Sequence, residues 1–297
     1  MSQASIEIIL MCYNRPQMAF QALESILRSA PPGVRVIVSD NSTNASVEQA
    51  LLSFKERGLY RRREKSFKAL DHFNQVISEV QSDYFMMFHD DDIMMEDCIQ
   101  NFNLAIAKYP QAVAIAMNAV KMKGEELKGP WHNSQLKDDF ILKSFDELAE
   151  MYLDFRKEIN PFPGYLYKNL GAQSPRISHR NGRKYADVAF VLNYIQRGPI
   201  VWLKNPGLYY RQHENNDSNV IDLKGVVLLS KFIQSRAQAK RIEKFILEFK
   251  FGSVFAWWRQ NMNRTFTKRE RTLFFAMLKY LVSHPRFVFD KVMAQLK

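Results

Sequence analysis

The sequence predicts an α/β fold with a mostly parallel sheet and a helical region at the C-terminal end. Over the first 120 residues, short apolar runs alternate with segments whose apolar residues recur at helical spacing, which is the pattern of βαβ units. From about residue 222 the helical pattern is nearly continuous. A globular chain is expected, because 46% of the 297 residues are hydrophobic and 25% are charged.

The same patterns place the individual elements. We expect strands at 6–12, 34–39, 84–88 and 112–117, and helices near 16–29, 45–57, 69–80 and 95–108. Beyond residue 120 the order loosens. There we expect a polar stretch to about 143, a helix near 144–158, a Pro/Gly-rich turn at 160–164, a strand at 165–168, a basic loop at 176–184, a helix near 185–197 and two short strands ending at Tyr210.

Cysteine usage and the two ends of the chain favour a cytoplasmic protein. Cys12 and Cys98 are too few for a disulfide framework or a cysteine zinc site. The first residues lack the pattern of a signal peptide. The most apolar late segment, 272–282, is about half as long as the roughly 20 residues of a membrane-spanning helix. We therefore expect a chain that does not cross a membrane.

Three consecutive carboxylates directly follow a predicted strand. Asp90, Asp91 and Asp92 come after the apolar run that ends at Phe88 and His89. Their mutual repulsion would cost stability unless a cation neutralises it, and carboxylate oxygens suit Mg²⁺ or Mn²⁺. The alternative is an acidic loop that caps the next helix.

Polar residues also end two other predicted strands. Cys12-Tyr13-Asn14 follows the first strand, and Asp40-Asn41-Ser42 follows the second. Carboxyl ends of parallel strands meet at one edge of an open sheet, so we expect these residues and His89 to face one ligand. Asp40 could equally cap a helix, and Tyr13 could be core packing.

Further charged residues could complete such a site. Arg61-Arg62-Arg63, Lys65 and Lys68 could attract a diphosphate, or they could be solvated surface charges. Asp187 precedes an apolar helix, where it is a candidate base or another helix cap.

A cation and an imidazole follow the last predicted strand. They are Arg211 and His213, separated by one residue. His213 is a candidate metal ligand or an ordinary loop histidine.

With these residues in hand, the chain resembles the family 2 glycosyltransferases of the GT-A fold from about residue 4 to residue 218. The resemblance implies a Rossmann-like mixed sheet flanked by helices. It makes 1–220 the catalytic domain, with a nucleotide-binding half at 1–120 and an acceptor half at 121–220, followed by a basic amphipathic helical region at 221–297.

The resemblance also implies roles for single residues. Tyr13-Asn14-Arg15-Pro16 is similar to the family's first-strand turn, and we assign Cys12, Tyr13, Asn14, Arg15 and Lys68 to nucleotide-sugar binding. Val38-Ser39-Asp40-Asn41-Ser42-Thr43 is similar to its "VDDGST" signature, so Asp40 would contact the base. His89-Asp90-Asp91-Asp92 lies where the family has its DxD-type motif. That match places nucleotide contacts at Asp90 and the divalent ion at Asp91, while His89, also assigned to the nucleotide, stands where a first Asp is common.

Two later segments match as well. Residues 185–188 are similar to the family's "ED" region, which would make Asp187 the catalytic base. Arg211-Gln212-His213 is similar to its "RxH" element, with Arg211 near the diphosphate and His213 on the metal, and 215–218 fits the same loop.

The implied activity is an inverting, metal-dependent transfer from a nucleotide-diphosphate sugar to a hydroxyl of a carbohydrate or glycolipid. Asp187 would remove the acceptor proton while Mn²⁺ or Mg²⁺ and nearby cations stabilise the departing nucleoside diphosphate. We take the donor to be a UDP-sugar.

The net charge of +11 lies in the C-terminal region. Residues 221–297 hold 16 Lys/Arg against 5 Asp/Glu, whereas 1–220 hold 26 of each. The cations are mixed with aromatic residues, namely Phe251, Phe255, Trp257, Trp258, Phe274, Phe275, Phe287 and Phe289. This mixture suits the inner face of an anionic cell membrane, with a lipid-linked acceptor as in bacterial surface polysaccharide synthesis (O-antigen, capsule or lipopolysaccharide). The alternative is a helical bundle packed on the catalytic domain.

Three other functions remain as alternatives. The basic region could bind nucleic acid, but zinc-finger spacing and aromatic RNA-binding signatures are absent, so no nucleic-acid partner is expected. A sugar nucleotidyltransferase usually has a glycine-rich loop after the first strand, and 12–16 contain no glycine. A non-catalytic relative is the third.

Overall fold

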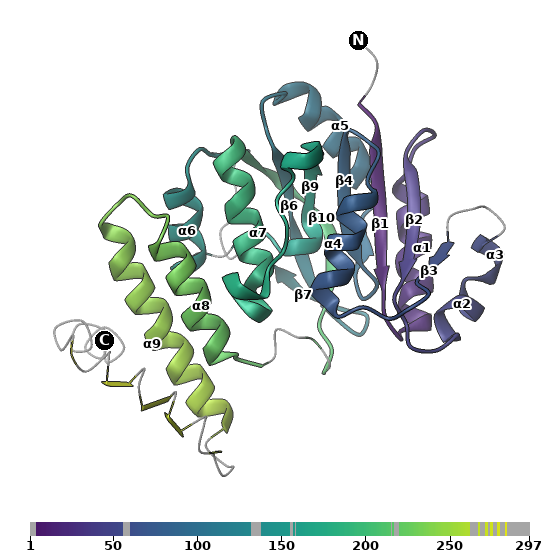
Figure 1. Cartoon of the computed structure of the whole chain (residues 1–297). Coiled ribbons are helices and arrows are strands. Elements are labelled where there is room, and N and C mark those ends of the chain that lie inside the picture. Colours follow the sequence, from purple (N-terminus) through teal and green to yellow (C-terminus); the bar gives the residue numbers. More distant parts are fainter. Residues whose placement is uncertain are drawn as a thin grey trace.

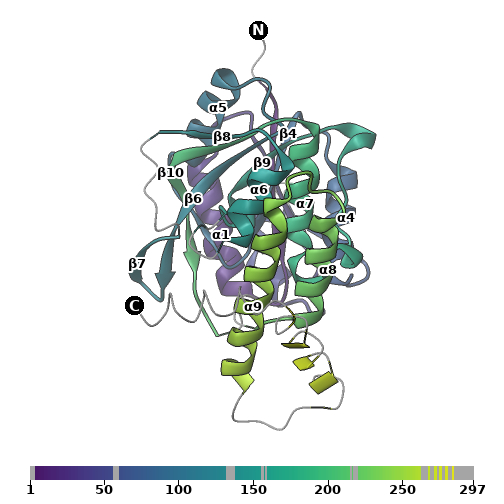
Figure 2. The same ribbon diagram turned by 90° about the vertical axis from the view of Figure 1, so that its left-hand side faces the viewer.

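The computed structural model describes residues 4–55, 60–131, 138–154, 157, 159–214, 216 and 220–261, together with 267, 271, 272, 274, 275, 278, 279 and 283. These residues form one mixed sheet with helices on both faces (Figures 1 and 2). The α/β class expected from the sequence is confirmed.

The sheet places the ends of four parallel strands at one edge. Its strands are β1 (Ile6–Cys12), β2 (Arg35–Asp40), β3 (Tyr60–Arg62), β4 (Tyr84–His89), β5 (Ile93–Met94), β6 (Ala114–Lys123), β7 (Glu126–Pro130), β8 (Phe140–Leu142), β9 (Tyr165–Lys168) and β10 (Ile200–Arg211). Among the described residues their order is β3-β2-β1-β4-β9-β6-β10-β5, with β7 on β6 and β8 on β10. β3, β2, β1 and β4 are parallel neighbours, so their carboxyl ends lie together, and β9 is antiparallel to both β4 and β6.

Helices cover the two faces of this sheet. They are α1 (Pro16–Ser29), α2 (Ser46–Ala50), α3 (Leu52–Lys55), α4 (Ala69–Glu79), α5 (Cys98–Lys108), α6 (Phe145–Leu153), α7 (Ala186–Tyr194), α8 (Leu223–Gln234) and α9 (Arg241–Asn261). Short 3₁₀ helices lie at η1 (Phe162–Gly164), η2 (Gly171–Gln173), η3 (His179–Asn181), η4 (Arg183–Tyr185) and η5 (Ile195–Arg197). α1 and α5 pack on one face, and α4, α6, α7, α8 and α9 pack on the other.

The central strand β1 shows why residues 8–12 form a continuous apolar run. Ile8 and Leu10 pack toward α1, whereas Ile9 and Met11 pack toward α4. Successive side chains of a strand point to opposite faces, and both faces of this strand are buried. Burial on both faces therefore accounts for the apolar residues 8–12, whereas the buried Glu7 of the same strand is paired with Arg35 at 3.2 Å.

Several expected elements differ in the structure. The polar stretch expected to about 143 contains the strands β7 and β8. The helix expected at 45–57 divides into α2 and α3, because the buried Leu51 leaves the helical backbone region at φ −107° and ψ 18°; 56 and 57 lie outside the described residues. The two short strands expected before Tyr210 are one strand, β10. Pro206 lies at a shift in the register between β10 and β6, beyond the segment of β10 that pairs with β8 and before the segment that pairs with β5. The strand can thus continue past a residue that has no N–H.

The C-terminal helices α8 and α9 pack against the helices on one face of the sheet. Leu229 of α8 and Ile246 and Trp257 of α9 belong to the same apolar core as Phe190 of α7. For residues 221–261, this packing matches the helical bundle that the sequence analysis gave as an alternative for 221–297. Phe287 and Phe289 lie outside the described residues. No helix in the described part of the chain combines the length and apolar character needed to cross a membrane.

Candidate active site

The turn after β1 joins the ends of three strands. Asn14 adopts a left-handed backbone with φ +54°, which asparagine tolerates better than most residues. Its amide donates to Ser42 Oγ at 2.8 Å, and its side-chain oxygen accepts from the Thr43 amide at 3.0 Å. The Tyr13 amide donates to Asp90 Oδ2 at 2.7 Å. The turn therefore contacts the residues that follow both β2 and β4.

Asp40 and Cys12 lie at this edge but are enclosed. Asp40 is fully buried, and its carboxylate accepts hydrogen bonds from the Tyr60 hydroxyl and, at 2.9 Å, from the Ser42 amide. Cys12 is also buried, and burial raises the pKa of its thiol. Neither side chain is open to a ligand in this structure, so direct base contacts by Asp40 and Cys12 stay predictions. What the geometry shows for Asp40 is that it fixes the loop after β2.

Arg15 connects the first strand to the carboxylate cluster. Its Nη1 atom lies 2.9 Å from Asp90 Oδ1 and 2.9 Å from Asp91 Oδ2. The two carboxylate side chains are almost completely enclosed, whereas the side chain of Arg15 is 33% exposed. One guanidinium thus partly neutralises two neighbouring acids while keeping a solvent-facing surface.

The end of β10 reaches the same carboxylates from the other side. The Arg211 amide donates to Asp92 Oδ1 at 3.1 Å, and Arg211 Nε donates to the Asp91 carbonyl at 2.5 Å. His213 Nε2 lies 3.0 Å from Asp91 Oδ2. Residues that are more than 110 positions apart in sequence therefore meet at the turn after β4.

The electrostatics of the three acids differ. Burial raises the pKa of Asp90 to about 6, against the opposing effects of the Tyr13 amide and Arg15. Burial and the charge of Asp91 raise the pKa of Asp92. Burial also acts to raise the pKa of Asp91, but the positive charges around it, Arg15 among them, hold that pKa below its ordinary value. The cluster retains repulsion that a further cation would relieve.

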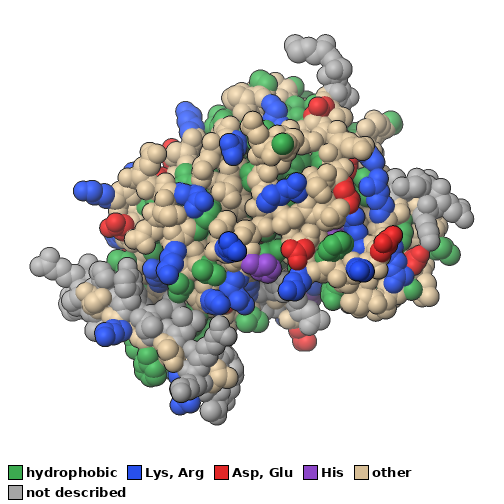
Figure 3. All heavy atoms as spheres, in the orientation of Figure 1, with side chains coloured by type: hydrophobic (Ala, Val, Ile, Leu, Met, Phe, Trp, Pro, Cys, Tyr) green, Lys and Arg blue, Asp and Glu red, His purple; other side chains and the backbone are tan. Residues whose placement is uncertain are grey.

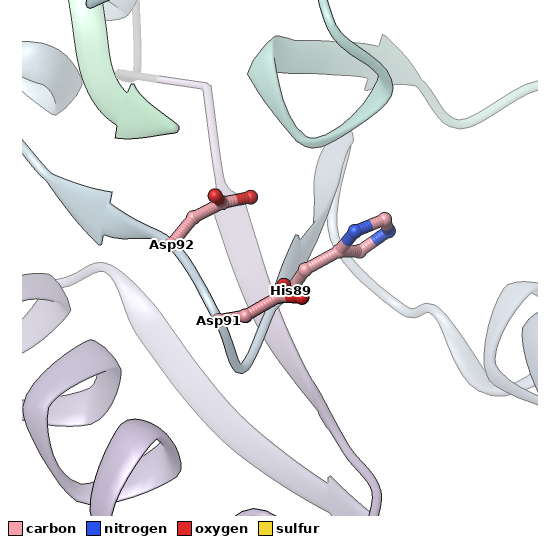
Figure 4. Close-up of side chains that lie close together, drawn as sticks. All are labelled: His89, Asp91 and Asp92. Atoms are coloured by element: carbon pink, nitrogen blue, oxygen red, sulfur yellow. The ribbon is translucent and has the colours of Figure 1, made fainter. Parts of the chain in front are cut away.

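The donor atoms of the cluster fit a divalent ion. Figure 4 shows His89, Asp91 and Asp92 at the end of β4 and in the turn after it, with one ligand atom from each within 4.8 Å of the others. In the described structure Asp92 Oδ2 is buried without a hydrogen-bond partner, an arrangement that costs free energy unless a cation or donor meets the atom. Carboxylate oxygens and imidazole nitrogens both suit Mn²⁺. His213, which we expected as a ligand, adds a nitrogen beside Asp91.

The basic segment before α4 lies beside the ends of β2 and β3. The Phe67 amide donates to Asn41 Oδ1 at 2.7 Å, and Asn41 Nδ2 donates back to the Phe67 carbonyl at 3.0 Å. Lys68 follows and is exposed at the start of α4. Figure 3 shows Lys and Arg side chains around a few acidic side chains and a histidine on this side of the molecule. The contact of Lys68 with a diphosphate stays a prediction.

Other cations of this segment serve the fold. Arg61 and Arg62 lie within β3 rather than after it. Arg62 pairs with Glu48 at 2.5 Å, and Arg63 pairs with Glu79 at 2.6 Å. These residues hold β3 against neighbouring helices.

Asp187 lies in the first turn of α7, and its role as the base stays a prediction. It is half-buried, and its Oδ1 atom accepts from the Val188 amide at 2.8 Å. After burial, the Asp187 carboxylate is a further cause that raises the pKa of the buried Tyr165. Phe162 connects this helix to the carboxylate cluster, because its ring is 5.9 Å from that of His89 and 6.0 Å from that of Phe190.

Sequence reasoning placed Ser42 and Thr43 at this edge but did not foresee that they orient the first turn. It missed Tyr60, which holds Asp40, and Phe162, which packs between His89 and α7. The Pro-rich turn around Phe162 was visible in the sequence, but its spatial neighbour was not. Of the 215–218 loop, only Asn216 is described; its side chain donates to the Arg211 carbonyl at 3.1 Å and accepts from the His213 amide.

Comparisons with known proteins agree with this arrangement. The family described as Glycosyl transferase family 2 matches residues 7–165. The structure is similar to S. aureus TarS 1–349 in complex with UDP-GlcNAc, with a TM-score of 0.68 at 13% identity over 94% of this chain and 80% of that chain. It is also similar to the mannosyltransferase PcManGT from Pyrobaculum calidifontis in complex with GDP-Man and Mn2+, with a TM-score of 0.59 at 12% identity over 98% of this chain and 88% of that chain. No curated protein matches the sequence significantly. The expected GT-A fold is confirmed.

Proposed function

This chain belongs to glycosyl transferase family 2, and we propose that it transfers a sugar, with inversion, from a nucleotide-diphosphate sugar to an acceptor hydroxyl. One observation carries the proposal. Arg15 from the β1 turn and His213 from the end of β10 both contact Asp91 Oδ2, at 2.9 and 3.0 Å. Strand ends that are distant in sequence thereby form one charged centre at the edge where open α/β sheets bind ligands.

The donor is a nucleoside-diphosphate sugar, and we take it to be a UDP-sugar. Two proteins of similar fold are bound to such donors, namely UDP-GlcNAc and GDP-Man. In this chain the solvent-facing part of Arg15, together with Lys68, supplies positive charge for the pyrophosphate. The amides of Tyr13 and Asn14, together with the Asn14 side chain, fix the loop against which the nucleotide would lie.

Asp91 and His213 would hold Mn²⁺ or Mg²⁺, with Asp92 and His89 within reach of the same ion. When bound, the ion would neutralise negative charge on the leaving diphosphate. Arg211 supports the site by keeping Asp92 and the Asp91 carbonyl in place.

Asp187 would act as the base that takes the proton from the acceptor hydroxyl. Its place in the first turn of α7, beside buried tyrosine rings, partly removes it from water. Desolvation strengthens a carboxylate as a base. A single displacement with this base inverts the configuration at the anomeric carbon.

For the acceptor we propose a carbohydrate or a lipid-linked glycan, in the synthesis of a bacterial surface polysaccharide at the cytoplasmic face of the membrane. The support is the basic and aromatic composition of 221–297. On this proposal the catalytic domain comprises 1–220, although its apolar core continues into α8 and α9.

A donor panel with Mn²⁺ tests the function. Thermal protection by each nucleotide sugar and release of nucleoside diphosphate would be measured for the unmodified chain, Asp91→Asn, Asp187→Asn and Asp97→Asn. Asp97 is a matched control, since it is an exposed acid at the start of another helix, α5.

We expect Asp91→Asn to lose donor protection, and Asp187→Asn to keep protection while turnover falls about 100-fold or more. Asp97→Asn should behave like the unmodified chain. Turnover that persists in Asp187→Asn would refute its role as the base. If no donor protects the unmodified chain or releases its nucleotide, the proposed function is wrong.

A further inference from the structure

Helix α9 has one apolar face that the fold covers and another that it leaves open. Ile242, Ile246 and Trp257 are buried in the core shared with α6, α7 and α8. Phe255 and Trp258, which are three residues apart and so adjacent on the helix surface, are 46% and 40% exposed. The sequence of α9 is thus apolar beyond what packing on the catalytic domain requires.

The open face lines an apolar groove. The groove has a volume of about 280 Å³ and is lined by Phe251, Val254, Phe255, Trp258, Phe274 and Leu278. The ring of Phe274 lies 5.5 Å from that of Trp257, which fixes this wall against α9. Phe275 beside it is 60% exposed. Soluble proteins that expose a contiguous group of large apolar side chains commonly use it for binding.

Positive charges neighbour the groove residues in the sequence. Arg259 follows Trp258, Lys279 follows Leu278 and Arg271 lies three residues before Phe274, and all three cations are exposed. They belong to the region 221–297, whose 16 Lys/Arg face only 5 Asp/Glu. A second copy of the chain would bring two basic surfaces together, which like-charge repulsion opposes.

The groove and the active site lie toward the same end of the molecule. Figures 1 and 2 show the C-terminal end of α9 extending beyond the sheet toward the end at which β1 terminates. A flat surface touching α9 there would lie on the side of the molecule where β1 ends.

We propose that this groove, together with the neighbouring cations Arg259, Arg271 and Lys279, docks the protein on an anionic lipid bilayer. Phe255, Trp258 and Phe275 enter the headgroup region, where aromatic rings are favoured. Arg259, Arg271 and Lys279 meet lipid phosphates at the surface. Docking itself needs no catalysis, but its use rests on the proposed function, because it would bring a lipid-linked acceptor to the catalytic edge.

The test is co-sedimentation of the full chain with vesicles of phosphatidylcholine alone or mixed with phosphatidylglycerol. We expect binding to the mixed vesicles that is about tenfold stronger than to the neutral ones and that weakens at high salt. The double variant Phe255→Ser/Trp258→Ser should lose about tenfold or more of this binding. The matched control is Leu104→Ser on α5, because Leu104 is 64% exposed and lies outside the groove.

Two double substitutions that each remove two positive charges measure the electrostatic part of vesicle binding separately from the apolar part. Arg259→Gln/Lys279→Gln should weaken binding about tenfold, whereas Arg197→Gln/Lys204→Gln, the same charge change at exposed positions outside the groove, should weaken it less. Circular dichroism and donor protection, measured on every variant, check folding independently of lipid binding.

Several outcomes would overturn the inference. They are equal binding to both kinds of vesicle, no binding to either, and equal losses in the groove variants and their controls. A mass change by light scattering, or binding of a single-stranded oligonucleotide, that disappears in the groove variants would assign the groove to a second copy or to nucleic acid. Donor protection without vesicle binding would refute docking alone, and vesicle binding without donor protection would refute the proposed function alone.

Discussion

His72 makes the stability of this protein depend on pH through a hydrogen-bond chain behind the active-site edge. Ser39 Oγ accepts from Arg63 Nε at 3.0 Å and from Arg63 Nη2 at 2.8 Å, which uses both of its lone pairs. Its single hydroxyl proton is left to donate to His72 Nε2, 2.7 Å away. The imidazole must therefore be neutral there, with Nε2 as the acceptor.

The magnitude follows from the pKa of His72. Burial, and then the charge of Arg63, lower that pKa from 6.5 to about 4 in the fold, with Glu79 opposing. At 1.36 kcal/mol per pH unit, this difference corresponds to roughly 3 kcal/mol. Because the folded pKa is the lower one, the unfolded chain binds the proton first as pH falls. The contribution of neutral His72 to the free energy of unfolding is complete above about pH 6.5 and is lost progressively as pH falls toward about 4.

Urea unfolding across this pH range measures the effect. His72→Gln keeps an oxygen that accepts from Ser39 and does not titrate, so its free energy of unfolding should fall with pH by roughly 3 kcal/mol less than that of the unmodified chain. His179→Gln is the control, because His179 is exposed in η3. Parallel pH profiles for His72→Gln and the unmodified chain would refute the reasoning.

Two further predictions concern the site and the sheet. Arg15→Gln should lower the free energy of unfolding by roughly 2 kcal/mol without metal, because it leaves enclosed carboxylates unpaired. In the unmodified chain Arg15 and a bound Mn²⁺ would compete for Asp91, so Mn²⁺ should raise the melting temperature of Arg15→Gln more than that of the unmodified chain in scanning fluorimetry. Equal rises would contradict this competition. Gly207→Ala should cost about 1–3 kcal/mol in urea unfolding, because its Cβ would lie 2.8 Å from Met117 Sδ and 3.0 Å from Met117 Cβ. Unchanged stability would show that Met117 moves aside freely.

Much of the fold could be predicted because local patterns encode burial. The expected strand 6–12 has the bounds of β1, and the expected strand 165–168 has those of β9. Errors arose where tertiary contacts override local signals. Two short strands were expected before Tyr210, yet one strand, β10, passes through Pro206 with a shifted register beside β6.

The site was predictable in its residue types and less so in its contacts. Asp91 and His213 were expected on one ion, and the structure brings them within 3.0 Å. Arg15 was expected to bind the nucleotide, and in the structure it bridges two carboxylates. Asp40 was expected to face the base, and it is enclosed beneath Tyr60. The roles of these residues in binding stay predictions.

By itself, the sequence determined the alternation of strands and helices, the carboxylates after β4 and the excess of cations beyond 220. These features depend on neighbours along the chain, whose spacing decides which side chains can be buried. Only the tertiary structure decided that Arg15 and His213 share one oxygen of Asp91, and that one face of α9 stays open. Such contacts depend on strand order, register and helix packing, which residues distant in the sequence fix together.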